Sequence, residues 1–303
     1  MALRMRVPPS TRVSGILFRP SFHYASAKAS IETRVRELRK RATLWAALGH
    51  PQWATLFSLD PTAVGPIQAL KPGAKVVALP DPVAQAARPE DREGAHAREA
   101  LRAQLGVPEG RLMLLLFGVL DERKGLAEVS RALTMLRPDT ARQLAVVFAG
   151  PIASRLEAQV TGWAEAARAN GAVVVMRNRF MHEPEIRALL HASDGLLLCY
   201  QGHIGSSAVL IRAAGAGLPV IGATFGLLGA HIRRHRLGQA VESTDPVAIA
   251  GALDVFARTP RAGFDPEAAQ RFAEANTVDG YVHTLLKHTL GQRSRSIAAN
   301  RID

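Results

Sequence analysis

Short apolar runs separated by amphipathic segments are the main pattern of this chain. Three such runs lie in the first eighty residues, at 13–18, 54–59 and 75–79, and each is typical of a buried strand. Residues 60–70 can form a short helix between the second run and the third. The pattern predicts a strand, a helix and a strand in succession, which indicates an α/β fold.

The alternation is more regular in the second half of the chain. Strands are predicted at 112–117, 144–149, 172–176, 195–199 and 218–222. Helices are predicted between them at 125–136, 153–170 and 183–192, and in the small-residue segment before Leu218. Repeated strand-helix units predict a parallel sheet with helices on both faces, in a doubly wound domain.

The regular pattern is interrupted after the first three strands. Pro80-Asp81-Pro82 breaks it, and residues 84–102 are polar, charged and without aromatic side chains, as in a linker or an exposed helix. We therefore expect a first domain at 1–83, a linker at 84–110, a second domain at 111–262, final helices at 263–290 and a basic tail at 291–303.

A basic amphipathic helix is predicted at residues 31–48 of the first domain. Its apolar positions recur at helical spacing, at Ile31, Val35, Leu38, Ala42 and Trp45. Lys and Arg occupy the remaining faces, and residues 1–50 hold ten Lys and Arg against two Glu. Such a helix can lie on an anionic membrane surface, and the alternative is a solvated outer helix of an α/β domain.

Composition narrows the classes of function. The 303 residues include 38 Lys and Arg against 26 Asp and Glu, a formal charge of +12, which fits an anionic partner. An aromatic content of 5% and the lack of a base-reading motif argue against nucleic acid. The single cysteine, Cys199, leaves no internal disulfide, and no apolar run reaches the roughly 18 residues that span a bilayer. We expect a cytoplasmic protein, with any membrane contact peripheral and at the inner face.

Two strand ends carry groups that suit an anion. Gly205, Ser206 and Ser207 stand where a helix should begin, so backbone N–H groups and the helix dipole can receive a phosphate. The serine hydroxyls either cap the helix or donate to that anion. Gly118 opens a turn that presents Lys124 as a point charge for a phosphate, the alternative being a solvated turn lysine. The two strand ends together favour a phosphate site.

A third strand end holds a histidine. Residues 19–24 follow the first predicted strand, and open α/β sheets bind ligands at the carboxyl ends of their strands. His23 is therefore a candidate site residue, and the alternative is a surface loop histidine. The motifs of metal-dependent transfer, nicotinamide redox chemistry, ATP hydrolysis and serine hydrolysis are absent, so we expect no metal and no cofactor.

Several segments carry a family resemblance when they are taken in order. They are LLLFGVLDERKG, AVVFAG, PEIRALLHASDGLLLCY, AAGAGLPVIGATFGLLG and LGQAVESTDPVAIAGAL. Their order resembles the group 1 (family 4) glycosyltransferases, over about residues 13–290. The resemblance implies a GT-B-like fold of two Rossmann-like domains, with the final helices packing back toward the first domain.

The resemblance also implies a reaction. It is the metal-independent, retaining transfer of a sugar from a nucleotide-sugar donor, a substrate rather than a cofactor, to a glycan or lipid-linked acceptor held by the first domain. By position, Lys124 matches the basic residue on the donor diphosphate, and Gly118 and Gly205–Ser207 complete the diphosphate site. Met181 matches the residue beside the nucleobase, and His23 falls near the acceptor-side catalytic histidine.

Three departures from the family pattern change this picture. Val119 follows Gly118 where the family usually has arginine, and Ile204 and Arg212 replace the two family glutamates. Arg212 lies seven residues after Gly205, on the same helical face, where it either reaches a donor oxygen in the nucleoside site or is solvated. In the family about half of the first domain precedes the strand that matches residues 13–18, so we expect an incomplete N-terminal domain. The alternative function is a catalytically impaired GT-B remnant that binds a nucleotide or glycan.

Overall fold

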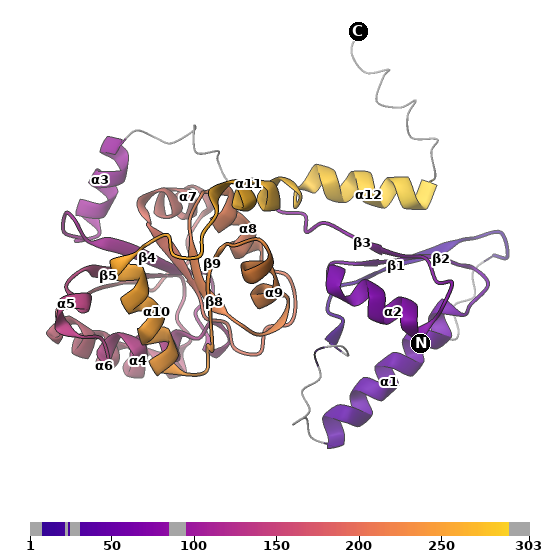
Figure 1. Ribbon diagram of the computed structural model, residues 1–303, viewed down its shortest axis with the longest axis horizontal. Helices are drawn as coiled ribbons and strands as arrows, with labels where there is room; N and C mark the ends of the chain where they lie inside the picture. Colours follow the sequence, from indigo (N-terminus) through magenta and orange to yellow (C-terminus); the bar gives the residue numbers. More distant parts are fainter. Residues whose placement is uncertain (1–7, 22–23, 25–30, 85–94, 291–303) are drawn as a thin grey trace, which may run out of the picture. The chain divides into compact units, whose positions relative to one another are not determined.

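The computed structural model describes residues 8–21, 24, 31–84 and 95–290. These residues form two compact units (Figure 1). The first unit contains the chain up to Ala84, Ile204–Ser206 and the chain from Ala275 onward. The second unit contains Gln85–His203 and Ser207–Glu274.

The first unit is a three-stranded parallel sheet in the order β1-β2-β3. Its strands are β1 (Val13–Leu17), β2 (Trp53–Ser58) and β3 (Val76–Ala78). Its helices are α1 (Ile31–Leu48), the 3₁₀ turn η2 (Pro61–Ala63), α2 (Val64–Leu70) and α12 (Val278–Leu290). Within this unit, α1 and α2 lie on one face of the sheet and α12 lies on the other (Figure 1). The three strands predicted from the apolar runs are confirmed.

The core of the first unit is small. It consists of Leu48, Leu56, Ala63, Ile67 and Val76. The last helix is attached to the sheet, because Thr55 Oγ1 and Lys75 Nζ each donate to the carbonyl of His288, at 3.3 Å.

The second unit is a six-stranded parallel sheet in the order β6-β5-β4-β7-β8-β9. The strands are β4 (Leu112–Phe117), β5 (Leu144–Ala149), β6 (Val173–Arg177), β7 (Gly195–Leu198), β8 (Val220–Ala223) and β9 (Gly238–Val241). The helices are α3 (Ala95–Gln104), η4 (Glu122–Lys124), α4 (Leu126–Thr134), α5 (Pro138–Ala141), α6 (Ser154–Ala169), α7 (Glu183–Ala192), α8 (Ala208–Gly215), α9 (Gly226–Arg234), α10 (Pro246–Arg258) and α11 (Pro266–Glu274).

The central strands of this sheet are apolar along their whole length because helices cover both faces. Every residue of β5 is buried, as are five of the six residues of β4. These two strands begin and end at the predicted residues, and the other predicted strands differ from the observed ones by one or two residues at their ends. The predicted parallel α/β architecture is confirmed.

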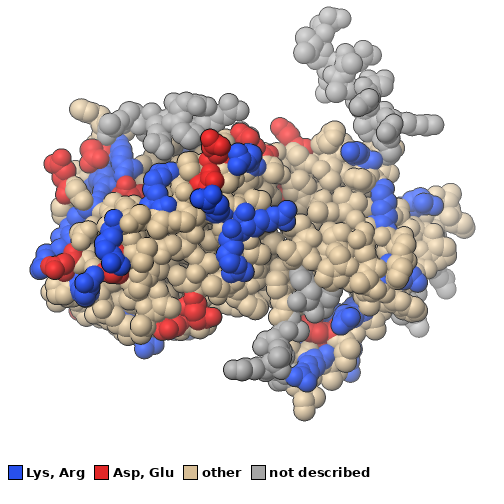
Figure 2. All heavy atoms as spheres, viewed as in Figure 1, with Lys and Arg blue, Asp and Glu red and all other residues tan. Residues whose placement is uncertain are grey.

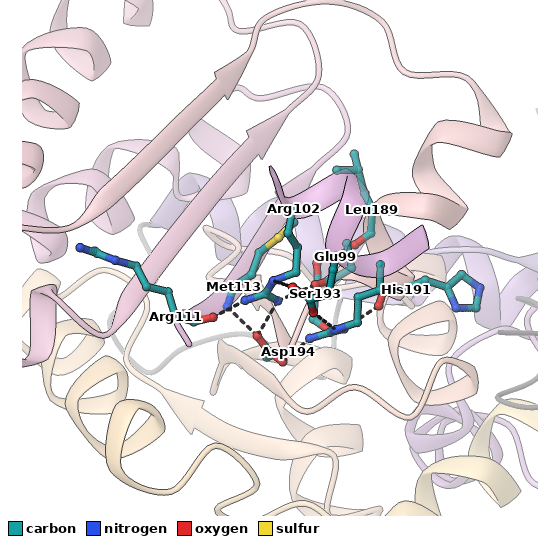
Figure 3. A network of polar contacts seen from close by, with 10 residues as sticks. Glu99, Arg102, Arg111, Met113, Leu189, His191, Ser193 and Asp194 are labelled. Atoms are coloured by element: carbon teal, nitrogen blue, oxygen red, sulfur yellow. Dashed lines mark hydrogen bonds and ion pairs between the residues drawn. The ribbon is translucent and has the colours of Figure 1, made fainter. Parts of the chain in front are cut away.

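A helix lies within the segment 84–110 that was expected to be a linker. Helix α3 is tied to the second unit through Asp194, which follows α7 (Figure 3). Arg98 Nη2 donates to Asp194 Oδ1 at 2.6 Å, and the buried Arg102 donates through Nη1 to Asp194 Oδ2 at 3.1 Å. The second half of the expected linker is therefore an ordered part of the second unit. None of the helices in the described ranges is long and apolar enough to cross a bilayer.

Candidate functional site

The candidate site of the second unit lies where β4 and β7 end side by side. From β4 the chain continues to β5 and β6 on one side of the sheet, and β7 then pairs with β4 on the other side. In open α/β sheets a ligand binds at such a switch point, outside the carboxyl ends of the strands. The turn after β4 carries the predicted Gly118 and Lys124, and the loop after β7 begins with Cys199 and Tyr200.

Two glycines allow the turns at this edge to approach one another. Gly125 has φ +68°, and a side chain there would place its Cβ 2.0 Å from the carbonyl oxygen of Cys199. Gly150, after β5, has φ +139°, and its Cβ would lie 1.8 Å from the carbonyl oxygen of Gly118. Only glycine fits such positions, so these contacts fix the turn that carries Lys124.

Lys124 is held above Tyr200. Its Nζ donates to the Tyr200 hydroxyl at 2.8 Å and lies 4.2 Å from the centroid of the ring, a cation–π distance. Tyr200 is buried, and its own carbonyl accepts from Ser243 Oγ at 2.9 Å. Among the described residues, no carboxylate forms an ion pair with Lys124. The site therefore presents an ordered cation whose charge is not neutralised by a described acid, as an anion-binding group requires.

Gln201 joins three loops at this edge. Its N–H donates to the carbonyl of Arg123 at 2.8 Å, and its side-chain Nε2 donates to the carbonyls of Cys199 and Ser243, at 2.9 Å and 2.6 Å. These bonds connect the segments that follow β4, β7 and β9. The arrangement limits the movement of the turn around Lys124, which favours binding by a preformed site.

The predicted phosphate turn divides between the two units. Ser207 is the N-cap of α8, and its Oγ accepts from the N–H of Leu210 at 3.3 Å. Ser207 thus makes the capping bond that was one of its two expected roles. Gly205 and Ser206 group with the first unit, whereas Gly118, Lys124 and Ser207 belong to the second. Gly118 lies beside Lys124, because a Cβ at Gly118 would be 3.6 Å from Nζ.

Arg212 is paired with an acid. Its Nη2 donates to Glu183 Oε1, the first residue of α7, and its side chain is mostly buried. Glu183 is 29 positions earlier in the chain. The charge reversal at Arg212 is thus accompanied by a carboxylate from a neighbouring helix.

The loop between β6 and α7 contains Met181, the residue predicted beside the nucleobase, next to Phe180. Met181 is 8% exposed, whereas the preceding Phe180 is 69% exposed. The Phe180 ring lies edge-on to His182, with ring centroids 5.2 Å apart. Phe180 is therefore the exposed aromatic side chain of this loop, and the placing of Met181 beside the nucleobase stays a prediction.

The residues that match a known protein family are largely those of the second unit. Residues 97–277 match the family model described as "Glycosyl transferases group 1", which covers more than half of the sequence. The chain belongs to the group 1 glycosyltransferases.

Relatives in this family are longer than the chain. D-inositol 3-phosphate glycosyltransferase of Streptomyces coelicolor is 31% identical over 224 residues, which are 68% of this chain and 48% of that protein. The chain spans about half the length or less of the curated relatives it matches.

Solved structures show the same fold at low identity. An α,α-trehalose-phosphate synthase (UDP-forming) from Burkholderia vietnamiensis superposes with a TM-score of 0.69 at 15% identity, over 97% of this chain and 69% of that chain. The Anabaena protein HepE, solved in complex with UDP, gives a TM-score of 0.65 at 15% identity, over 91% of this chain and 71% of that chain. These likenesses confirm the GT-B-like fold expected from the sequence.

Three further features of this group 1 chain are its predicted acceptor-side histidine, its single cysteine and its potential metal ligands. His23 lies outside the described residues. Burial raises the pKa of the Cys199 thiol to about 12, so this cysteine is not a nucleophile at neutral pH. Across the described ranges, no group of three or more His, Cys, Asp or Glu is placed to hold a metal ion.

Two partners of the predicted residues were not identified from the sequence. Tyr200 could have been predicted to lie near Gly118 and Lys124. It follows β7 just as Gly118 follows β4, and adjacent parallel strands bring such residues to one edge of the sheet. Glu183 had no such signal. Its pairing with Arg212 depends on how the start of α7 packs against the last turn of α8.

Proposed function

We propose that this chain transfers a sugar from a nucleotide-sugar donor to a glycan or lipid-linked acceptor, with retention and without a metal ion. The observation that carries the proposal is Lys124, a cation held by Tyr200 at the switch point of the sheet, with no described carboxylate to neutralise it. A leaving nucleoside diphosphate gains negative charge in the transition state, and a fixed cation stabilises that charge.

The other site residues would bind different parts of the donor and the acceptor. Gly118 and Gly205–Ser207 would complete the diphosphate site, and Met181 and Arg212 would serve the nucleoside, with Phe180 as an exposed ring in the same loop. His23 would act on the acceptor side. A lipid-linked acceptor would place the protein in the cytoplasm, in peripheral contact with the inner face of the membrane.

The proposal is tested by thermal unfolding with and without nucleotides. UDP is the first ligand to try, because the Anabaena structure contains it and the Burkholderia enzyme is UDP-forming. A ligand at one hundred times its Kd stabilises the native state by about 2.7 kcal/mol. For a unit of this size, that corresponds to a rise in Tm of roughly 5–10 °C.

Lys124→Ala supplies the decisive comparison. Loss of a charged hydrogen bond of about 1.5–3 kcal/mol should weaken UDP binding roughly 10- to 150-fold, whereas uridine, which has no phosphate, should bind equally to both proteins. Arg123→Ala is the matched control, because Arg123 is adjacent and exposed and is paired with Asp121. If neither UDP nor GDP nor their sugar conjugates raise the Tm of the intact chain, the proposal is wrong.

One observation favours a second candidate, a GT-B module that binds a nucleotide or glycan without turnover. Ile204 and Arg212 stand where the family has acids, and Arg212 is already engaged with Glu183. The two candidates differ in hydrolysis. An active transferase should release nucleotide from its sugar donor slowly to water, whereas the module should be stabilised by the nucleotide and release none.

A further inference from the structure

Helix α1 has two apolar faces, and only one of them is used by the sheet. Leu48 is buried in the core of the first unit, and Leu44 packs against that core. On a different side of the helix, Ile31 is 82% exposed and Leu38 is 63% exposed. The helix therefore carries a second apolar surface that its own unit leaves largely exposed, with Lys71 Nζ lying 4.8 Å from the ring centroid of Trp45 at one end.

The exposed residues form one stripe along the helix. They are Ile31, Val35, Leu38, Ala42 and Trp45, and Val35 and Trp45 are 43% and 52% exposed. The residues are spaced alternately by four and three positions. At 100° per residue, this spacing keeps all five within a sector of roughly 80° of the helix surface. We call these five residues the α1 stripe. Its length is about four turns of helix.

Arginines border the α1 stripe on both sides. At 100° per residue, Arg34 and Arg41 lie along one border and Arg39 lies along the other, and all three are exposed. Figure 2 shows lysine and arginine side chains on this part of the first unit. Arginine can keep its charged end in water while its stem lies along an apolar surface, so both borders can face lipid headgroups.

Helix α1 contains two acidic residues against five basic ones. Glu37 lies toward the unit, where it accepts from Ser21 Oγ at 3.1 Å and from Lys40 Nζ at 2.8 Å. Glu32 is the other acid of the helix, and it stands beside the Arg39 border. The surface around the stripe is therefore cationic.

We propose that the α1 stripe docks in the interface of an anionic lipid bilayer, with the helix parallel to the membrane plane. An apolar stripe with cationic borders is the pattern of helices that bind in this way. A second copy of the chain fits less well, because pairing two stripes would bring arginine borders against arginine borders. The proposal deepens the proposed function, since it gives the surface that would bring the enzyme to a lipid-linked acceptor.

Vesicle flotation of the intact chain tests the proposal. Vesicles of phosphatidylcholine with about 30% phosphatidylglycerol should carry the protein, and vesicles of phosphatidylcholine alone should not. Each arginine near an anionic surface contributes about 1 kcal/mol, so the variant with Arg34, Arg39 and Arg41 changed to Gln should bind roughly 100-fold more weakly. High salt should weaken the wild type in the same direction.

Two further variants separate the apolar stripe from general charge. Leu38→Glu should lower vesicle binding more than tenfold, because it puts an acid in the middle of the stripe. Arg36→Gln is the matched control, since Arg36 is exposed but lies well away from the stripe, and it should reduce binding no more than about fivefold. Both changes are at exposed positions, so the Tm should be unchanged.

The results that overturn the proposal are distinct from those that overturn the proposed function. Equal binding to neutral and anionic vesicles, absence of binding, or wild-type binding by Leu38→Glu would each reject membrane docking. So would a dimer in solution that Leu38→Glu converts to a monomer, because the stripe would then be covered by a second copy. UDP stabilisation should persist in Leu38→Glu and weaken in Lys124→Ala, whose vesicle binding should be normal.

Discussion

Asp194 should be a key polar residue for the stability of the second unit. Its carboxylate accepts from Arg98 at 2.6 Å, from Arg102 at 3.1 Å and from the N–H of Met113, at the start of β4, at 2.7 Å (Figure 3). It thereby ties α3 to a central strand. Asp194→Ala removes all three bonds and leaves the buried Arg102 with one more distant acid, Glu99, whose Oε2 lies 4.0 Å from Arg102 Nε.

The size of the effect follows from the burial of Arg102. Leaving a buried cation without its partner costs about 3–5 kcal/mol. Arg102 keeps one bond to the carbonyl of Ala192, at 2.9 Å, and one to the carbonyl of Arg111, so we expect the lower end, about 3 kcal/mol. For a unit of this size, the Tm should fall by roughly 6–12 °C.

Urea unfolding followed by circular dichroism measures the change. Asp139→Ala is the matched control, because Asp139 pairs with Arg142 on the surface and its loss should cost less than about 1 kcal/mol. Adding Arg102→Met to Asp194→Ala should restore part of the stability, since the buried cation is then gone. An Asp194→Ala protein as stable as Asp139→Ala would refute the reasoning.

Three other predictions concern the second unit. Gly125→Ala should destabilise it by more than about 2 kcal/mol in urea unfolding, because alanine is strained at φ +68° and its Cβ would meet a carbonyl oxygen. Gly162→Ala should instead stabilise it by about 0.5–1 kcal/mol, because Gly162 is exposed in the interior of α6 and a Cβ there would have no neighbouring side chain within 4 Å. Cys199 should resist iodoacetamide in the native protein and react only after unfolding, as followed by mass spectrometry; native alkylation at the rate of a free thiol would contradict its burial. Burial, with a smaller effect of Arg234, lowers the pKa of His235 below 6.5, so the unfolded state binds more protons and the stability should fall as the pH drops below about 6.5. His235→Asn should show a shallower fall, and an equal fall in both proteins would exclude His235 as the cause.

The apolar pattern predicted the fold well because its elements depend on local sequence. The strands at 112–117 and 144–149 are continuous apolar runs. Such runs are typical of the central strands of a parallel sheet, which helices cover on both faces. The segment around α3 was harder to interpret. Its charges favour a linker when they are considered locally, and the role of Arg102 becomes clear only when Asp194, 92 positions later, lies beside it.

In the candidate site, too, some features follow from local sequence and others depend on tertiary packing. Lys124 and Gly118 could be placed from sequence, because strand ends in a parallel sheet share one edge. Met181 was predicted beside the nucleobase by position in the family, but whether Met181 or Phe180 is exposed depends on how the loop packs. The α1 stripe was visible as a periodicity, and the sequence left open whether the helix lies on an anionic membrane surface or is a solvated outer helix of the domain.

The sequence by itself determined the order of strands and helices, the family, and the placing of a lysine and a glycine-rich turn at a strand end. These properties follow from local hydrophobicity and backbone preference, which neighbouring residues set. Only the tertiary structure decided that Lys124 rests on Tyr200, that Arg212 pairs with Glu183 and that Ile31 and Leu38 remain exposed. Each of these depends on side chains that are distant in the chain, and packing alone decides which of them come together or stay apart.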